Sequence, residues 1–257
     1  LKGDHQLGSL PSGLRSLWSD RIERVASADE NGAYWIDALQ GLSLSRITLS
    51  KKVLKAAGRA LGEPLDEAVS AWEREGLLIR APDGSIRFCH SEMRREIASK
   101  VPPEVSSRWH MVWAAALARL DEEQSGRYGL ERGLHLVDAK EPEEALSVLL
   151  DSAEHSYNWG QTHRTAKAAV TAEELARRHN DAIRVAWALR WQGGAALAAG
   201  RVDDADRLLD SARRMFDRER VLVGVGATLE ALAGSRISRA AYDAAVELCT
   251  YGVEAYR

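Results

Sequence analysis

The sequence feature that most constrains the fold is an alternation of small and large apolar residues in the segment 188–216 (ALRWQGGAALAAGRVDDADRLLDSARRMF). Small residues are needed where two antiparallel helices cross closely, and larger residues fill the space between the crossings. The segment therefore predicts a pair of packed antiparallel helices. The positions that carry the pattern are Leu189, Gly193, Ala196, Gly200, Ala205, Leu209 and Ala212.

These offsets match those of a tetratricopeptide repeat. A similar pair is predicted over 140–178, with Gly160 near its turn, and the segment 241–257 resembles the second helix of another repeat. We expect about three helix pairs with irregular spacing, preceded by a single helix near 130–138. Each unit of such an array buries its apolar face only against its neighbours. We therefore also expect the array to be truncated, because its last repeat would need a further neighbour or a polar cap.

The first hundred residues have a different pattern. Apolar residues at three- and four-residue spacing predict helices over 14–27 (with Ser12 as N-cap), 33–43, 48–61 and 65–75. The stretch LLIRAPDGSIRFC (77–89) predicts two short strands around a Pro-Asp-Gly turn. Helices followed by a two-stranded hairpin are typical of a winged helix.

The predicted fold is thus mainly α, with one small β-hairpin followed by an α-solenoid. Residues 1–13 are expected to be a linker from a preceding domain, residues 14–100 a winged-helix domain and residues 101–127 a helical linker. Tetratricopeptide-like repeats are expected over 128–257.

Composition and motifs argue against several functions. The formal net charge of −3 does not favour nucleic acid or acidic membranes as partners, and Cys89 and Cys249 fit no disulfide or metal framework. The sequence has no apolar run long enough to span a membrane, so we expect no membrane partner and a cytoplasmic protein. Without a Walker A loop, a nucleophile motif or a histidine pair with metal-ligand spacing, we expect no metal, no cofactor within this chain and no enzymatic activity.

His90 is the histidine with the most informative position, at the junction between the predicted hairpin and the helix that follows. Ser91 is expected to cap that helix, whose free N–H groups and partial positive charge favour an anion. His90 could donate a hydrogen bond to a phosphate at this point. The alternative is that it satisfies a neighbouring carbonyl at the end of the hairpin.

Two further positions suggest a partner surface. Trp187 and Arg190 lie on the first helix of the best repeat, at positions that normally face the concave surface of such an array. Aromatic and arginine side chains are enriched at binding hot spots, so these two residues are candidates for binding a protein partner. The other tryptophans fall on apolar helix faces and are expected in the core.

A winged helix also raises the possibility of DNA binding. The stretch 65–80, which would enter a major groove, carries four acids (Asp66, Glu67, Glu73 and Glu75) against Arg74 and Arg80. Because phosphate contacts supply most non-specific affinity, nucleic acid is an unlikely partner on this count.

The order of parts resembles the region that follows the ATPase core in STAND-type signalling NTPases. LPSGLRSLWSDRIERV (10–25) looks like the segment that leaves the core, and RFCHSEMRR is similar to the family motif Phe-x-His-x-x-x-Arg, carried here by Phe88, His90 and Arg94. In the family this histidine contacts the phosphates of ADP. Cys89 and Ser91 stand where plant immune receptors have Met and Asp.

The resemblance implies a regulatory and sensor fragment. The winged helix would hold an upstream ATPase module, with ADP or ATP bound in the full-length protein, in its off state. The repeats would bind an inducer or partner protein. The alternatives are a constitutive protein-interaction scaffold and, less favoured, a DNA-binding transcription factor.

Overall fold

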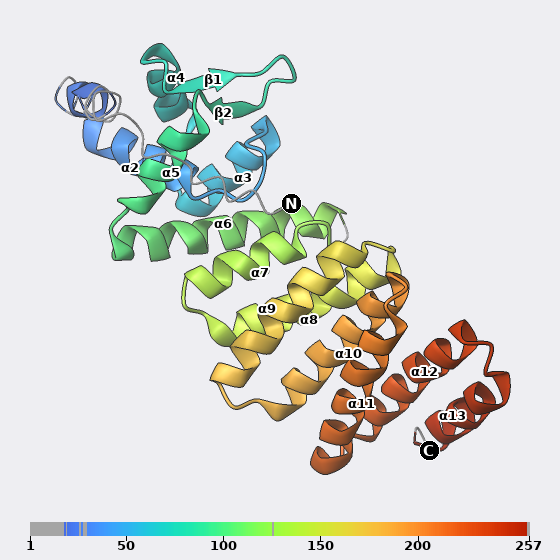
Figure 1. Ribbon diagram of the computed structural model, residues 1–257. Helices are drawn as coiled ribbons and strands as arrows, with labels where there is room; N and C mark the ends of the chain where they lie inside the picture. Colours follow the sequence, from blue (N-terminus) through green and yellow to red (C-terminus); the bar gives the residue numbers. More distant parts are fainter. Residues whose placement is uncertain (1–17, 19, 26, 28–29, 125, 256–257) are drawn as a thin grey trace, which may run out of the picture. The chain divides into compact units, whose positions relative to one another are not determined.

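The computed structural model describes residues 18, 20–25, 27, 30–124 and 126–255 (Figure 1). The expected linker 1–13, the start of the first helix and its cap Ser12 lie outside these residues, whereas residues 20–25 are helical. The chain divides into two compact units, residues 1–120 and 121–257. Helix dominates both units among the described residues, and the only strands described form one two-stranded sheet in the first unit.

The first unit contains the helices and the hairpin that the sequence predicts. The described elements are α2 (Gly32–Ser43), α3 (Lys51–Leu61), α4 (Asp66–Arg74), β1 (Leu78–Arg80), β2 (Ile86–Phe88), α5 (Ser91–Ser99) and most of α6 (Pro103–Gln124). Helix α3 begins where the Oγ of Ser50 accepts the N–H of Val53 at 3.3 Å, and it ends at Gly62, whose φ is 87°. Both ends therefore follow local capping rules.

The hairpin is antiparallel and pairs Leu78 with Phe88, Ile79 with Arg87 and Arg80 with Ile86. Its turn contains Gly84 at a φ of 78°, a conformation that glycine adopts without strain. Beyond β2, the N–H of Ile86 donates to the carbonyl of Leu49 at 2.9 Å. Leu49 lies between α2 and α3, so the segment that joins these helices forms an isolated bridge to the outer edge of the hairpin.

Helix α6 is held against α2 by tryptophans. The ring nitrogen of Trp113 donates to the carbonyl of Gly41 at 2.9 Å, and both Trp109 and Trp113 are fully buried. A Cβ atom at position 41 would lie 2.0 Å from the ring of Trp109. Glycine is therefore required at position 41 for the two helices to approach this closely.

The second unit is a stack of antiparallel helices in which each helix packs against the next (Figure 1). Its helices are α7 (Gly129–Asp138), α8 (Pro142–Asn158), α9 (Thr162–Arg178), α10 (Ala182–Ala198), α11 (Val202–Glu219), α12 (Leu222–Ser238) and α13 (Tyr242–Ala255). A single helix followed by three pairs agrees with the sequence prediction, and the packing is solenoid-like.

The expected irregular spacing is wrong. Helices α8, α9, α10, α11, α12 and α13 begin at residues 142, 162, 182, 202, 222 and 242, a constant step of 20 residues, or 40 per pair. The residues in the left-handed conformation follow the same step: Lys140, Gly160, Asn180, Gly200, Arg220 and Ala240. The regularity was hidden because only two of these six residues are glycines.

Each of these turns closes with the same backbone hydrogen bonds. At Gly200, for example, its N–H donates to Leu197 at 2.9 Å, and the next N–H, of Arg201, donates to Ala196 at 2.9 Å. This is the Schellman arrangement that ends helices at a left-handed residue. A constant turn fixes a constant angle between helices, so α10 contacts α8 and α12 as well as the helices beside it in sequence.

Candidate functional site

The structure places His90 directly before α5 in the first unit. Its backbone is extended (φ −133°, ψ 134°), it occupies the N-cap position without a capping side-chain bond, and its side chain is exposed. Ser91, expected to be the cap, is instead the first residue of the helix. Its Oγ donates to the carboxylate of Glu92 at 3.0 Å. The assignment of Ser91 as N-cap is therefore wrong.

Glu92 already occupies the positive end of α5. Its pKa is lowered chiefly by a hydrogen bond from its own backbone N–H, then by the hydroxyl of Ser91, with smaller effects of Arg95 and His90. An acidic side chain in the first turn is stabilised by the helix dipole. A phosphate that approached His90 at this helix end would therefore have to displace the Glu92 carboxylate.

The imidazole of His90 lies against Trp18, with ring centroids 6.0 Å apart and ring planes at 27°. Trp18 also lines an apolar hollow of about 210 Å³ in the first unit. The walls of the hollow include Ile22, Leu39 and Ile97, and Glu96 and Lys100 also line it. His90 is thus fixed by an aromatic contact at the surface, and no hydrogen bond to a neighbouring carbonyl is described for it.

The other two residues of the motif are structural in this fold. Phe88 is buried in the hairpin. Arg94 reaches back from α5 to the end of α2, where its Nε donates to the carbonyl of Ser43 at 2.9 Å and its guanidinium also contacts the carbonyl of Ser45. A cation that satisfies the last carbonyls of a helix stabilises it. Arg94 therefore fixes α5, and with it His90, relative to α2.

Trp187 and Arg190 both lie on α10 in the second unit, and both are partly buried. The ring of Trp187 packs edge-on against the buried Phe216 of α11, with centroids 5.0 Å apart. The guanidinium of Arg190 lies 3.8 Å from the ring centroid of its neighbour Trp191. Each candidate side chain thus also supports its own array, and only its exposed part is open to a partner.

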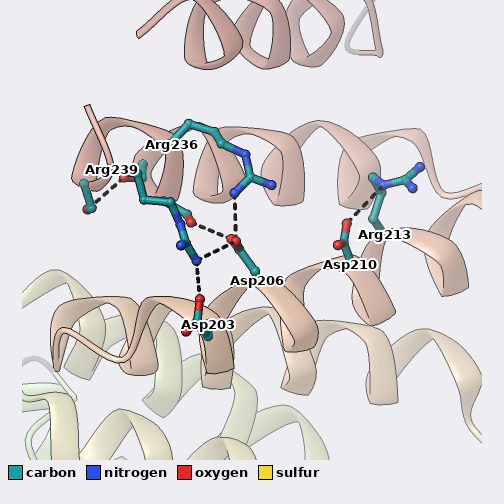
Figure 2. A network of polar contacts seen from close by, with 9 residues as sticks. Asp203, Asp206, Asp210, Arg213, Arg236 and Arg239 are labelled. Atoms are coloured by element: carbon teal, nitrogen blue, oxygen red, sulfur yellow. Dashed lines mark hydrogen bonds and ion pairs between the residues drawn. The ribbon is translucent and has the colours of Figure 1, made fainter. Parts of the chain in front are cut away.

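A charged network joins α11 to α12 (Figure 2). Asp206 accepts hydrogen bonds from the guanidinium of Arg236 at 2.7 Å, from that of Arg239 at 3.2 Å and from the hydroxyl of Ser235. Arg239 also contacts Asp203 at 2.5 Å. Burial tends to raise the pKa of Asp206, but these donors outweigh it and lower the pKa below its ordinary value.

The sequence analysis missed a basic face on α3. Lys51, Lys55 and Arg59 are exposed and four residues apart, so they lie on one side of the helix. No ion pair joins any of them to another described residue. The spacing was visible in the sequence, but attention to the predicted groove-binding stretch 65–80 overlooked it.

Among the residues that the structure describes, no group of three His, Cys, Asp or Glu could hold a metal ion. No described helix is both long enough and apolar enough to cross a membrane. Comparisons with protein-family models, curated proteins and solved structures found no match.

Proposed function

We propose that this chain is the regulatory and sensor part of a STAND-type signalling ATPase. In this proposal the first unit is a winged helix that holds an ATPase module in its ADP-bound off state. The second unit is a tetratricopeptide-like array that binds an inducer or partner protein, with Trp187 and Arg190 in the contact. Partner binding releases the winged helix because the partner has a higher affinity for the released state. Such a protein would work in the cytoplasm.

The pairing of Leu49 with Ile86 carries the proposal for the first unit. It adds a third extended segment to the hairpin, between the first two helices of the series α2, α3 and α4. Helix, short strand, two helices and a two-stranded wing is the order of a winged helix. In this arrangement His90 leaves the wing with its imidazole exposed at the start of α5.

The proposed role of His90 is to hold the phosphates of ADP bound to the ATPase module. The imidazole donates to a phosphate oxygen, and the first N–H groups of α5 become available once the phosphate displaces Glu92. A hydrogen bond to a charged group contributes about 1.5–3 kcal/mol. This predicts that the loss of His90 weakens ADP retention by about ten- to a hundredfold.

The test uses the protein in which this chain is joined to its ATPase module. His90→Ala should release bound ADP faster and raise basal signalling, whereas Glu92→Gln, which removes the competing charge, should slow release. His163→Ala, at an exposed histidine of the second unit, is the matched control. Release of a fluorescent ADP analogue by stopped flow measures all three. Equal release rates for wild type and His90→Ala would contradict the sensor role.

A second candidate, a constitutive protein-interaction scaffold, is favoured by the uniformity of the second unit. The same left-handed residue recurs in each turn from Lys140 to Ala240, which offers no turn built differently to act as a hinge. The two candidates differ in the dependence of partner binding on nucleotide. A scaffold binds its partner with equal affinity in the ADP-bound and nucleotide-free forms.

A further inference from the structure

The 40-residue period makes positions on α9, α11 and α13 equivalent, and one stripe of each helix can be compared. The stripe comprises residues 162, 166, 169 and 173 of α9, residues 202, 206, 209 and 213 of α11, and residues 242, 246, 249 and 253 of α13. On α9 and α11 all of these residues are buried or half-buried.

The next helix along the chain covers this stripe in both inner cases. On α9, Gln192 of α10 donates to the Glu173 carboxylate at 2.6 Å and contacts the carbonyl of Ala169 at 3.5 Å. On α11, Arg236 of α12 contacts Asp206 (Figure 2). The stripe is therefore the position where a following helix packs in this array.

On α13 the same stripe is exposed and entirely apolar. It consists of Tyr242 (63% exposed), Val246 (66%), Val253 (55%) and the free Cys249, which is also exposed. Single exposed apolar residues are ordinary, but a contiguous stripe of large ones indicates an interaction surface.

We propose that this stripe of α13 is the docking surface for an amphipathic helix of a partner protein, packed as α12 packs on α11 and edged by arginine. The arginine follows from charge. Asp243 is equivalent to Asp203, which Arg239 of α12 contacts. Within its described residues α13 carries three acids, Asp243, Glu247 and Glu254, and no Lys or Arg. Two α13 helices packed face to face would bring these acids together, which disfavours a second copy as the occupant.

The test uses this chain and a synthetic peptide of its own residues 221–241, which span α12, with Arg236→Leu because Val246 replaces Asp206 at the opposing position. The readout is the reaction rate of the Cys249 thiol with a soluble disulfide reagent. Cys89 is a slower background because it is partly buried and burial raises the pKa of its thiol. Saturating peptide should slow the Cys249 reaction at least tenfold.

Two variants make the result specific to the stripe. Val246→Glu, at an exposed position that should not affect folding, should abolish protection by the peptide. Tyr251→Ser should retain it, because Tyr251 is as exposed (61%) as Tyr242 but lies off the stripe. Circular dichroism verifies that both variants fold.

Three outcomes would overturn the proposal. The first is no protection at millimolar peptide, and the second is protection that survives Val246→Glu. The third is a dimer of the chain in light scattering that Val246→Glu dissociates, which would make a second copy the occupant. Protection that needs Val246 and not Tyr251, on a monomeric chain, supports it.

Discussion

At the scale of single residues, the array depends on one backbone conformation that is repeated at every turn. Gly160 and Gly200 adopt it without cost, whereas Ala240 holds a φ of 56° and Arg220 a φ of 57°. A left-handed conformation costs a residue with a Cβ roughly 1 kcal/mol relative to glycine. The structure accepts this cost because the turn fixes the packing of the two helices it joins.

This strain predicts opposite effects of two substitutions. Ala240→Gly should raise the free energy of unfolding by about 0.5–1 kcal/mol, and Gly200→Ala should lower it by about 1 kcal/mol. A Cβ at Gly200 would meet no atom within 4 Å, so the second effect reports the backbone alone. Urea unfolding measures both changes. A stabilising effect of Gly200→Ala would show that the left-handed conformation is not what this turn requires.

At the scale of elements, helices are joined by acids on one helix and arginines on a later one. Glu131 of α7 contacts Arg164 of α9 at 2.7 Å, and Glu143 of α8 contacts Arg184 of α10 at 2.6 Å. Asp206 on α11 is the most enclosed acid of the α11–α12 network, with 18% of its side chain exposed. Half-exposed pairs contribute little singly, but a shared carboxylate with several donors contributes more.

The lowered pKa of Asp206 predicts how stability depends on pH. Because the folded state favours the carboxylate, its stabilising effect is present above the ordinary pKa of an aspartate, about 3.9, and is lost as the pH falls through the lower folded pKa. Asp206→Asn should cost about 1 kcal/mol at pH 7 and less at pH 3. Asp210→Asn is the control, since the Asp210 carboxylate lies 4.0 Å from Arg213. Thermal unfolding at several pH values measures both. Equal losses at pH 7 and pH 3 would contradict the assignment.

At the scale of the whole molecule, the charge distribution bears on the choice among partners. The net charge is −3 and the first turn of α4 carries Asp66 and Glu67, which repel phosphates. The basic face of α3 (Lys51, Lys55 and Arg59) is the one feature described here that acts in the opposite direction.

We predict that this basic face is too small to support DNA binding. Three phosphate contacts would give a slope of about −3 for log affinity against log salt, and DNA-binding proteins commonly make six to ten such contacts. Fluorescence anisotropy with a labelled duplex at about 50 and 200 mM salt should show no specific binding. Salt-dependent binding that disappears on replacement of Lys51, Lys55 and Arg59 by alanine would instead favour a DNA-binding function.

The candidate site was only partly predictable from sequence. His90 was correctly expected beside a helix start, because turn residues and apolar periodicity are local signals. That Ser91 would bond Glu92 rather than cap the helix was not predictable, since the cap depends on the backbone angles at His90. The contact of Trp187 with Phe216 joins residues of two helices and has no local signal.

By itself the sequence determined the helices, the hairpin and a stack of helix pairs, because apolar periodicity and the glycines act within a few residues along the chain. Only the tertiary structure decided which faces are covered. It showed the bridge from Leu49 to Ile86, the close approach at Gly41 and the uncovered stripe of α13. The physical reason is that burial depends on which neighbour a side chain meets in space. Tyr242 and Val246 have the periodicity of core residues, yet no described helix covers them.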